Sequence, residues 1–339
     1  MNNFMSMKDY VLRLNTISVS DTEEVGIKNA FLGEMFTHPE LQQIRVPNGF
    51  AITASAYKRF IEYNKLDGVH DKLLASLDRK NLVSVNKIGL KARSLILGAR
   101  MPGDIDDAII AAYHDLCSDS AIEVAVRSSE ISFENTHKSS KDLYETFLNI
   151  KGERALIETV KKCFASLFSD LALIEKPSTH QAIAVCVQRM IDSEKSCSGV
   201  AYTSDPETGF ADVIHISGIW GHHEKKLQKS VVYDEFIIYK PSISTGIKSI
   251  IQKKLGSKNY MIVHQGDSGI HTVNTPVEMR DQFILLDEEV ISISNWGMLL
   301  ENYYNSPVSM EWAKDGKSED LYLLQAKPEF FKKLRENYD

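Results

Sequence analysis

The stretch SMEWAKDG (residues 309–316), followed by LYLLQAKP (residues 321–328), decides how this sequence is interpreted. Glu311 stands among apolar residues of one strand-like segment, and Gln325 and Lys327 alternate with apolar residues on the next. Oxygen atoms of Glu311 and Gln325 are ligands suited to Mg²⁺ that bridges phosphate oxygens, and Lys327 adds positive charge beside them. The sequence therefore predicts a metal and polyphosphate site on a sheet near the end of the chain.

Length and charge limit the classes of protein to consider. The 339 residues, 43% of them hydrophobic, are enough for roughly two globular units of about 150 residues each. The chain has 39 basic and 46 acidic residues, for a net charge of -7. It therefore has no basic field to attract a nucleic-acid backbone, and we expect no nucleic-acid partner.

The N-terminus and the cysteines indicate the compartment. Lys8, Asp9 and Arg13 lie where a signal peptide would have its apolar core, and no later run approaches the ~18 apolar residues of a membrane span. We therefore expect a cytoplasmic protein with no membrane partner. The cysteines form no CxxC pair and lack histidines at zinc-finger spacing, so we expect reduced thiols at Cys117, Cys163, Cys186 and Cys197.

The periodicity of apolar residues predicts a mixed α/β (α+β) protein. Helical spacing covers residues 56–66, 105–117 and 153–176, the last as one long helix, and residues 122–129 are typical of a short strand. The second half is richer in β-type runs, at residues 182–191, 198–204, 212–219, 234–240 and 321–327. No linker separates independent domains, so we expect two interlocked lobes, residues 1–185 and 186–332, with a tail at 333–339.

Three further segments carry residues suited to phosphate or nucleotide binding. In VGIKNAFLGEM (residues 25–35) a flexible Gly26 precedes Lys28 at the start of a helical pattern, where backbone amides and an ammonium group can approach a phosphate. In VAVRSS (residues 124–129) Arg127 ends an apolar strand, and its guanidinium suits phosphate binding. In AVCVQRMI (residues 184–191) a possible edge strand runs into Gln188. Each segment has an alternative interpretation. Lys28 could be an ordinary solvated lysine, Arg127 could anchor a helix end by a salt bridge, and residues 184–191 could simply be a buried strand.

The order and spacing of these motifs resemble one family along nearly the whole chain. The chain is similar to the N-terminal ATP-grasp nucleotide-binding domain of the phosphoenolpyruvate synthase and pyruvate phosphate dikinase family. The motifs that carry the resemblance are VGIKNAFLGEM, VPNGFAITASAYKRF, VAVRSS, ETFLNI, VQRMI, SGVAYTSDPETGF, DEFIIYK, LGSK, MEWAKDG and LLQAKP. The resemblance implies a two-lobed ATP-grasp fold with the nucleotide site between the lobes.

The resemblance also implies roles for individual residues. Lys28 and Arg127 match residues that contact the phosphates of ATP, and together with Lys327 they are the expected catalytic cations. The hinge strand from Gln188 through Arg189 to Met190 matches the segment that holds adenine. Three residues with carboxylate or amide groups match family residues that face phosphate or Mg²⁺, namely Glu224, Glu311 and Gln325. Glu311 and Gln325 are the expected metal ligands.

The family's chemistry implies a second partner besides ATP. Its ATP-grasp domain charges a histidine on a separate swivelling domain, and the final nucleotide products are AMP and phosphate. We expect the acceptor here to be a separate phosphohistidine-domain protein or a small molecule. His180 follows a hydroxyl residue as in a phosphohistidine segment, but no Gly-Gly turn precedes it, so we do not expect His180 to be phosphorylated.

Several positions depart from the family's pattern. Asp142 stands where the phosphate loop has a glycine, and Ser309 stands where an Asp precedes the metal-binding Glu. His222 and His223 replace a Leu and a Gly, and Lys327 replaces an Arg, which keeps the charge but loses the two-point grip on phosphate.

These departures leave three functions open. The first is an ATP-dependent, kinase-type phosphotransferase module. The second is a catalytically degenerate pseudoenzyme that binds a nucleotide and acts through a partner. The third is an ATP-grasp ligase that forms an acyl phosphate, which no residue specifies.

Overall fold

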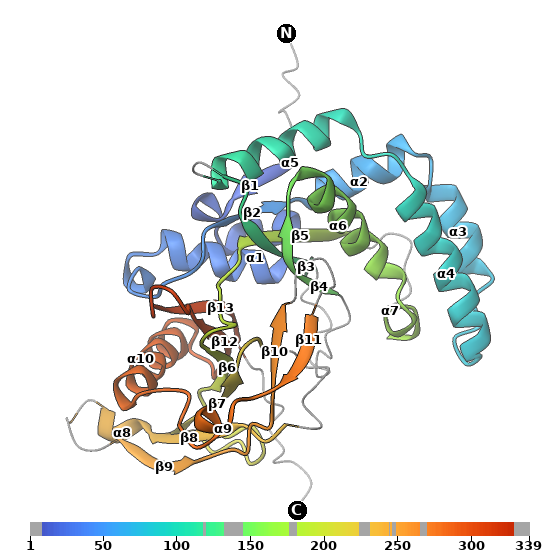
Figure 1. Ribbon diagram of the computed structural model, residues 1–339. Helices are drawn as coiled ribbons and strands as arrows, with labels where there is room; N and C mark the ends of the chain where they lie inside the picture. The colour runs from blue at the N-terminus through green and yellow to red at the C-terminus, as the bar shows by residue number, and fades with distance from the viewer. Residues whose placement is uncertain are drawn as a thin grey trace, which may run out of the picture. The chain divides into compact units, whose positions relative to one another are not determined.

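The computed structural model describes residues 9–117, 120–131, 145–175, 182–223, 231–243, 245, 249–264 and 270–328. The chain divides into two compact units. Unit 1 comprises Met1–Thr37 and Asn48–Met190, and unit 2 comprises His38–Pro47 and Ile191–Asp339. The lobe boundaries expected from the sequence remain a prediction. Each unit contains a sheet covered by helices (Figure 1).

Unit 1 is built on a five-stranded antiparallel sheet in the order β1-β2-β5-β3-β4. Its strands are β1 (Val11–Arg13), β2 (Gly49–Ile52), β3 (Glu123–Glu130), β4 (Thr146–Lys151) and β5 (Ile183–Arg189). The strands predicted at residues 122–129 and 182–191 are confirmed as β3 and β5. However, β5 is paired on both sides, with β2 and β3, so it is an interior strand and the interpretation as an edge strand is wrong.

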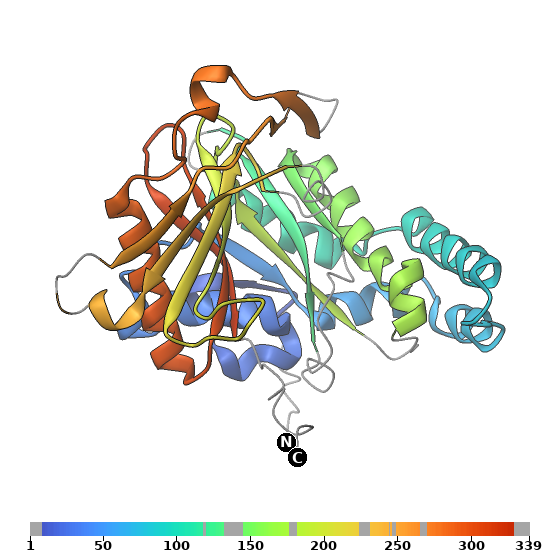
Figure 2. The same ribbon diagram turned by 90° about the horizontal axis from the view of Figure 1, so that it is seen from below.

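Helices surround this sheet (Figures 1 and 2). They are α1 (Thr22–Thr37), α2 (Ala54–Tyr63), α3 (Asp67–Ala75), α4 (Leu82–Gly98), α5 (Gly103–Leu116), α6 (Glu153–Ala165) and α7 (Asp170–Glu175). Short 3-10 turns in the chain are η1 (Leu14–Thr16), η2 (Val19–Asp21), η3 (Pro39–Leu41) and η4 (Ser166–Phe168). One sheet face packs against α2, α5 and α6 in the main apolar core, which includes Phe60, Val126, Phe164 and Val187. The opposite face is approached by α1, which contacts β3 and β5.

The long helix predicted at residues 153–176 is divided in two, so that prediction is wrong in part. The chain passes from α6 through the η4 turn, and Ser169 has an extended backbone with ψ 154°. The Ser169 hydroxyl accepts a hydrogen bond from the Ala172 N–H, 3.2 Å away, in the first turn of α7. Serine competes with the helix for backbone groups in this way, which periodicity alone does not reveal. The apolar residues at helical spacing in this segment, Leu156, Val160, Phe164 and Leu167, are nevertheless buried.

Unit 2 is built on a six-stranded antiparallel sheet in the order β13-β12-β6-β7-β8-β9. Its strands are β6 (Cys197–Tyr202), β7 (Val213–Trp220), β8 (Asp234–Tyr239), β9 (Ile250–Lys254), β12 (Val308–Lys314) and β13 (Leu321–Pro328). A separate hairpin consists of β10 (Tyr260–His264) and β11 (Ile270–Asn274). The helices of this unit are α8 (Lys240–Ile243), α9 (Val277–Arg280) and α10 (Asp287–Tyr304). The strand-rich second half predicted from the sequence is confirmed.

One face of the unit 2 sheet packs against α10, which contacts β6, β7, β12 and β13. Met310 and Trp312 of β12 are buried on this face, together with Ile293 and Leu300 of α10. Side chains alternate between the two faces of a strand. The residues between these buried positions, Ser309 and Glu311, therefore lie on the other face.

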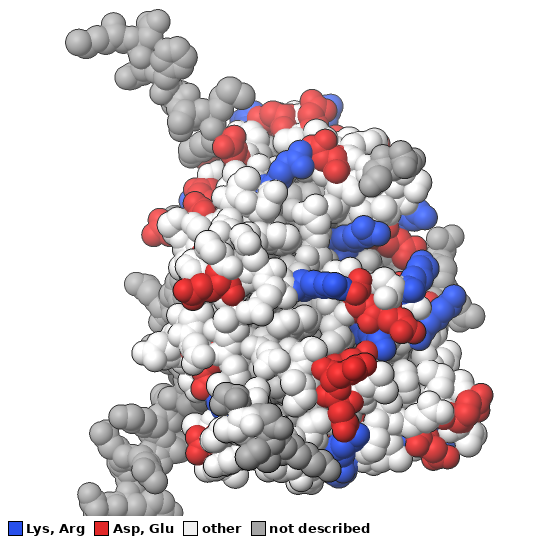
Figure 3. Space-filling model, turned by 90° about the vertical axis from the view of Figure 1, so that its left-hand side faces the viewer, with Lys and Arg blue, Asp and Glu red and all other residues white. Residues whose placement is uncertain are grey.

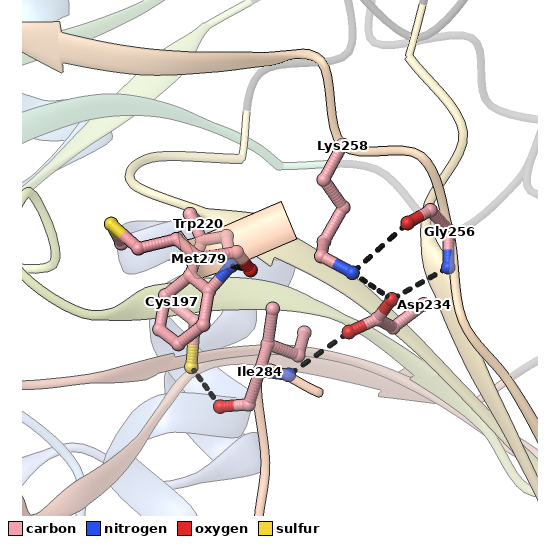
Figure 4. Close-up of polar contacts among 7 residues, drawn as sticks. All are labelled: Cys197, Trp220, Asp234, Gly256, Lys258, Met279 and Ile284. Atoms are coloured by element: carbon pink, nitrogen blue, oxygen red, sulfur yellow. Dashed lines mark hydrogen bonds and ion pairs between the residues drawn. The ribbon is translucent and has the colours of Figure 1, made fainter. Parts of the chain in front are cut away.

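A buried ion pair connects the LGSK segment to the sheet (Figure 4). The side chains of Asp234, at the start of β8, and Lys258 are both fully buried and form an ion pair. Asp234 also accepts hydrogen bonds from the N–H of Gly256, at 2.7 Å, and of Ile284, at 2.9 Å, while the Lys258 ammonium donates to the Gly256 carbonyl at 3.0 Å. The carboxylate thus holds together three segments of unit 2.

The surface carries charges of both signs. Figure 3 shows cationic and anionic side chains side by side on the face that it displays. Within the described ranges, no helix combines the length and the apolar character needed to cross a bilayer.

Candidate functional site

Helix α1 contains a sharp backbone irregularity at Gly26. This glycine has φ 77° and ψ 162°, values outside the helical region, although the helix continues on both sides. A Cβ atom at this position would lie 2.6 Å from the Ser129 carbonyl oxygen and 2.8 Å from that of Glu130. Both the positive φ and the close contact with β3 therefore require glycine.

The irregularity gives the segment after Gly26 a helix start of its own. Backbone N–H groups in the first turn of a helix lack partners within the helix. The Asn29 N–H donates to the Ser129 hydroxyl over 3.3 Å, so the end of β3 lies directly beside this turn. Lys28 is half-buried in the same turn. A helix start next to a lysine is a favourable place for a phosphate group, as the sequence predicted for Gly26 and Lys28.

Arg127 and Gln188 lie on the α1 side of the unit 1 sheet. Arg127 pairs across the strands with Cys186, and Ala125 pairs with Gln188, so these four residues share one face, opposite the core residues Val126 and Val187. Burial raises the pKa of the Cys186 thiol to about 12, while the positive charges of Arg127 and Lys28 act in the opposite direction. The structure thus brings Lys28 and Arg127 together near one thiol, from different elements.

The predicted adenine segment, Gln188 to Met190, is held by the strands around it. Gln188 is buried, whereas Arg189 is exposed and Met190 is half-buried. The N–H of Arg189 donates to the Asn48 carbonyl at 2.8 Å, and the N–H of Met190 donates to the Glu123 carbonyl at 3.0 Å. These two N–H groups are therefore already engaged within unit 1, and the adenine contact stays a prediction.

In unit 2, two cross-strand pairs bring the predicted polar residues of β12 and β13 together. Glu311 is opposite Gln325, and Ser309 is opposite Lys327. Residues directly opposite each other on neighbouring strands have Cβ atoms about 5 Å apart. All four side chains are half-buried and lie on the face opposite α10.

A β-bulge in β13 makes this arrangement possible. Trp312 is opposite Leu323 and Glu311 is opposite Gln325, so Leu324 is an extra residue in the ladder. Without it, strict alternation would place Gln325 and Lys327 on the same face as Leu323, against α10. The bulge turns both residues to the face of Glu311.

The donor set fits a metal ion that is held largely by phosphate. Among the residues that the structure describes, no three His, Cys, Asp or Glu side chains are close enough to hold a metal by themselves. Mg²⁺ commonly binds through one or two protein oxygen ligands together with substrate phosphates and water. The Glu311 carboxylate and the Gln325 amide oxygen, paired on one face, are compatible with that mode.

The two histidines of the WGHHE turn contact different neighbours. His222 is buried, and its Nδ1 is 2.7 Å from the Ser193 hydroxyl, with Glu194 3.9 Å from its Nε2. The His223 ring packs against Tyr233 at 5.7 Å. The pair therefore does not form a single two-histidine site. Glu224, Asp142 and His180 lie outside the described residues.

A cavity of about 980 Å³ opens elsewhere in unit 1, around the start of α6. Among the residues that line it are His114, Lys151, Glu153 and Arg154. No predicted site residue is part of this lining.

The structure thus brings the predicted residues together in two groups, each within one unit. Unit 1 holds Arg127 and Gln188 on one sheet face, with Lys28 of α1 near the Cys186 thiol of the same face. Unit 2 holds Glu311, Gln325 and Lys327 on one face of its own sheet. The sequence analysis did not predict a contact for Ser129, whose hydroxyl accepts a hydrogen bond from the Asn29 N–H. Two consecutive serines, Ser128 and Ser129, at the end of an apolar strand were the sequence feature that could have indicated it.

Comparisons with known proteins identify the family of this chain. Residues 22–338 match the family model described as pyruvate phosphate dikinase, AMP/ATP-binding domain. The chain is 37% identical over 337 residues to the phosphoenolpyruvate synthase of Aquifex aeolicus (strain VF5), covering 95% of this chain and 39% of that protein. It is 34% identical over 340 residues to that of Neisseria meningitidis serogroup B (strain ATCC BAA-335 / MC58), covering 97% and 43%, and 35% identical over 332 residues to that of Escherichia coli (strain K12), covering 94% and 42%.

The chain therefore spans about two fifths of the length of these curated relatives. The family match extends over nearly all of it, including every described residue that was predicted to contact nucleotide or metal. The chain belongs to the pyruvate phosphate dikinase AMP/ATP-binding domain family and is a nucleotide-binding module of the phosphoenolpyruvate synthase type.

Proposed function

We propose that this chain binds ATP with Mg²⁺ and transfers a phosphoryl group to an acceptor on another chain or to a small molecule. Phosphoryl transfer depends on positioning and on charge stabilisation more than on covalent chemistry by the protein. The residues described above supply both of these requirements.

Each residue has a definite task under this proposal. Lys28 and Arg127 neutralise charge on the phosphates, and the N–H groups after Gly26 donate to phosphate oxygens. Glu311 and Gln325 would hold Mg²⁺, which when bound would offset the charge of neighbouring phosphate oxygens. Lys327 adds a cation next to Ser309 and Glu311. Gln188, Arg189 and Met190 would contact adenine, and the role of Glu224 rests on the resemblance alone.

The observation that carries the proposal is the convergence of Lys28 and Arg127 beside the helix start at Gly26. Both cations lie near the Cys186 thiol, and the Ser129 hydroxyl ties the turn after Lys28 to β3. A glycine at φ 77° against the β3 backbone is a specific arrangement that an ordinary surface lysine does not need. The convergence favours phosphate binding over the solvated lysine considered as an alternative.

A second candidate function is a nucleotide-binding pseudoenzyme that acts through a partner. The observation in its favour is Ser309, which lies directly opposite Lys327 and leaves Glu311 as the carboxylate of the two cross-strand pairs. One fewer anionic ligand weakens the capture of Mg²⁺. ATP would then bind without efficient transfer.

Product analysis separates the two candidates. The protein is incubated with ATP, Mg²⁺ and, in turn, a purified phosphohistidine domain from a related enzyme or water alone, and nucleotides are resolved by chromatography. Phosphotransferase activity predicts acceptor-dependent AMP or ADP that is lost in Arg127→Ala and retained in the exposed control Arg79→Ala. Bound but unconverted ATP supports the pseudoenzyme, whereas absence of ATP binding contradicts both.

A further inference from the structure

Helix α4 of unit 1 presents an exposed apolar stripe at heptad spacing. Val83, Leu90 and Leu97 follow one another every seven residues, and their exposed fractions are 76%, 52% and 41%. Lys87 and Ser94 lie between them at the four- and three-residue steps that complete one helix face. The stripe extends about 21 Å along the helix at 1.5 Å per residue.

The opposite face of α4 accounts for the packing of this helix. Val85, Ala92 and Ile96 are fully buried in the core of unit 1, and α4 contacts α6 and α7. In Figures 1 and 2, α3 and α4 lie side by side at the right-hand edge of the drawing. The exposed stripe therefore has no part in the described core.

The charged side chains that α4 itself carries are all cationic. Lys87 lies on the stripe and Lys91 beside it, and both are exposed. The segment just before the helix contains one carboxylate, Asp78, and two cations, Arg79 and Lys80, whereas the segment from Leu82 to Gly98 contains no Asp or Glu. Neither Lys87 nor Lys91 forms an ion pair with any residue in the described ranges, in contrast to Arg93, which is 3.2 Å from the Asp170 carboxylate.

We propose that this surface, Val83, Lys87, Leu90 and Leu97 with Lys91, docks an amphipathic helix of another protein whose apolar seam is flanked by acidic residues. The seven-residue spacing places the three apolar side chains at the same position of successive heptads, so a partner helix that runs along α4 can contact all three. Exposed cations without carboxylates complement Glu or Asp on the partner. Two copies of α4 would instead place like charges together, which disfavours a second copy of this chain as the occupant.

A bilayer surface is the other macromolecule that attracts basic amphipathic helices. Membrane-bound helices of this kind bury a broad apolar face, often with aromatic residues. The stripe of α4 is a single row interrupted by Lys87 and Ser94, and α4 contains no aromatic residue. The geometry therefore favours a protein helix.

The test uses two fluorescein-labelled 21-residue peptides on the full chain. Both have leucine at the seam positions of each heptad, and one has glutamate and the other lysine at the flanking positions. We expect the glutamate peptide to bind at least about tenfold more tightly by fluorescence anisotropy, with an affinity that falls as salt is added. The double change Lys87→Glu with Lys91→Glu should reverse this preference.

Substitutions at the stripe complete the test. Leu90→Glu and Leu90→Ser should each weaken binding of the glutamate peptide about tenfold or more. Val277→Glu, at a 65% exposed apolar position of unit 2, should leave it unchanged. Circular dichroism checks that the variants fold.

Four outcomes overturn the proposal. They are no binding of the glutamate peptide, equal affinity for the two peptides, α4-dependent self-association in sedimentation, and α4-dependent binding to phosphatidylglycerol vesicles in place of the peptide. None of these measurements involves ATP, so their failure is distinguishable from failure of the proposed phosphotransferase function.

Discussion

The two units position their predicted ligand-binding residues by different backbone irregularities. In unit 1, the helix α1 is interrupted at Gly26, and the interruption creates a helix start beside Lys28. In unit 2, the strand β13 contains an extra residue, Leu324, and the bulge turns Gln325 and Lys327 away from α10. The break in α1 depends on the absence of a Cβ atom at Gly26, and the bulge in β13 depends on one extra residue in the strand.

The comparison teaches that regular periodicity gives the core of this fold and that its interruptions give the candidate site. A continuous α1 would have no helix start next to Lys28. A regular β13 would direct Gln325 and Lys327 toward the apolar face. The four predictions below break or sharpen this comparison, in order of decreasing effect.

Replacement of Gly26 by alanine should have the largest effect. Strain at a positive φ and overlap with the Ser129 and Glu130 carbonyls together predict a loss of about 4 kcal/mol in the free energy of unfolding. ATP binding should also be lost. Urea unfolding and calorimetry measure these effects.

Gly152→Ala is the matched control. Gly152 has φ 87°, but no heavy atom lies within 4 Å of a Cβ built there, so only the strain, about 1 kcal/mol, should remain. Equal losses in the two variants would show that the close contact with β3 is unimportant.

Asp234→Ala tests whether unit 2 depends on its buried ion pair, for which sequence periodicity gives no sign. The change leaves the fully buried Lys258 ammonium without its carboxylate, and breaking a buried pair predicts a loss of about 3 kcal/mol in stability. Glu235→Ala removes the neighbouring, partly exposed pair with Lys254 and should cost less than about 1 kcal/mol. Similar losses in both variants would contradict a special role for the Asp234 network.

Gln325→Ala tests the face that the bulge gives to β13. The change removes the amide that lies opposite Glu311, and the affinity for ATP with Mg²⁺ should fall about tenfold, or about 1.4 kcal/mol, in a calorimetric titration. Leu324→Ala keeps this amide and should retain the affinity. An unchanged affinity in Gln325→Ala would remove this residue of β13 from the candidate site.

Asp315 allows a smaller, pH-dependent test of the turn between β12 and β13. Burial raises the pKa of Asp315, but hydrogen bonds from the N–H groups of Ser318, Lys317 and Asp192 outweigh this effect, and the pKa lies below its ordinary value. Because the folded-state pKa is lowered, the stabilisation is present above the pKa of the unfolded chain. It is lost as the pH falls through the lower, folded-state pKa.

The wild type should therefore be more stable than Asp315→Asn at pH 7, and the difference should shrink below about pH 4. Urea unfolding across this range measures it. A difference that grows on acidification would reverse the sign of the argument.

Much of the secondary structure could be predicted because it follows from local apolar periodicity. The helices α2 and α5 and the strands β3, β5 and β7 follow directly from it. Lys28, Arg127, Glu311 and Gln325 were found because cations, amides and carboxylates at element ends are unusual in apolar segments. The structure places Lys28 near Arg127 and Glu311 opposite Gln325, and their contacts with nucleotide and metal stay predictions.

The remaining features depend on contacts between distant parts of the chain. The interior position of β5 is set by β2 and β3, which are remote in sequence. The Asp234–Lys258 pair and the bulge at Leu324 arise from burial and strand register, which no single segment encodes. The break at Ser169, like the contact made by Ser129, is a miss with a local signal, since serine is a common helix cap.

The central claim is that the turn after Gly26 and Arg127 together bind the phosphates of ATP. Titration calorimetry of ATP with Mg²⁺ into the wild type and into Arg127→Ala tests it most directly, with Arg79→Ala as the control. The account predicts measurable binding by the wild type and by the control, and a loss of about tenfold or more in Arg127→Ala. No heat with the wild type, or equal affinity in all three proteins, would contradict it.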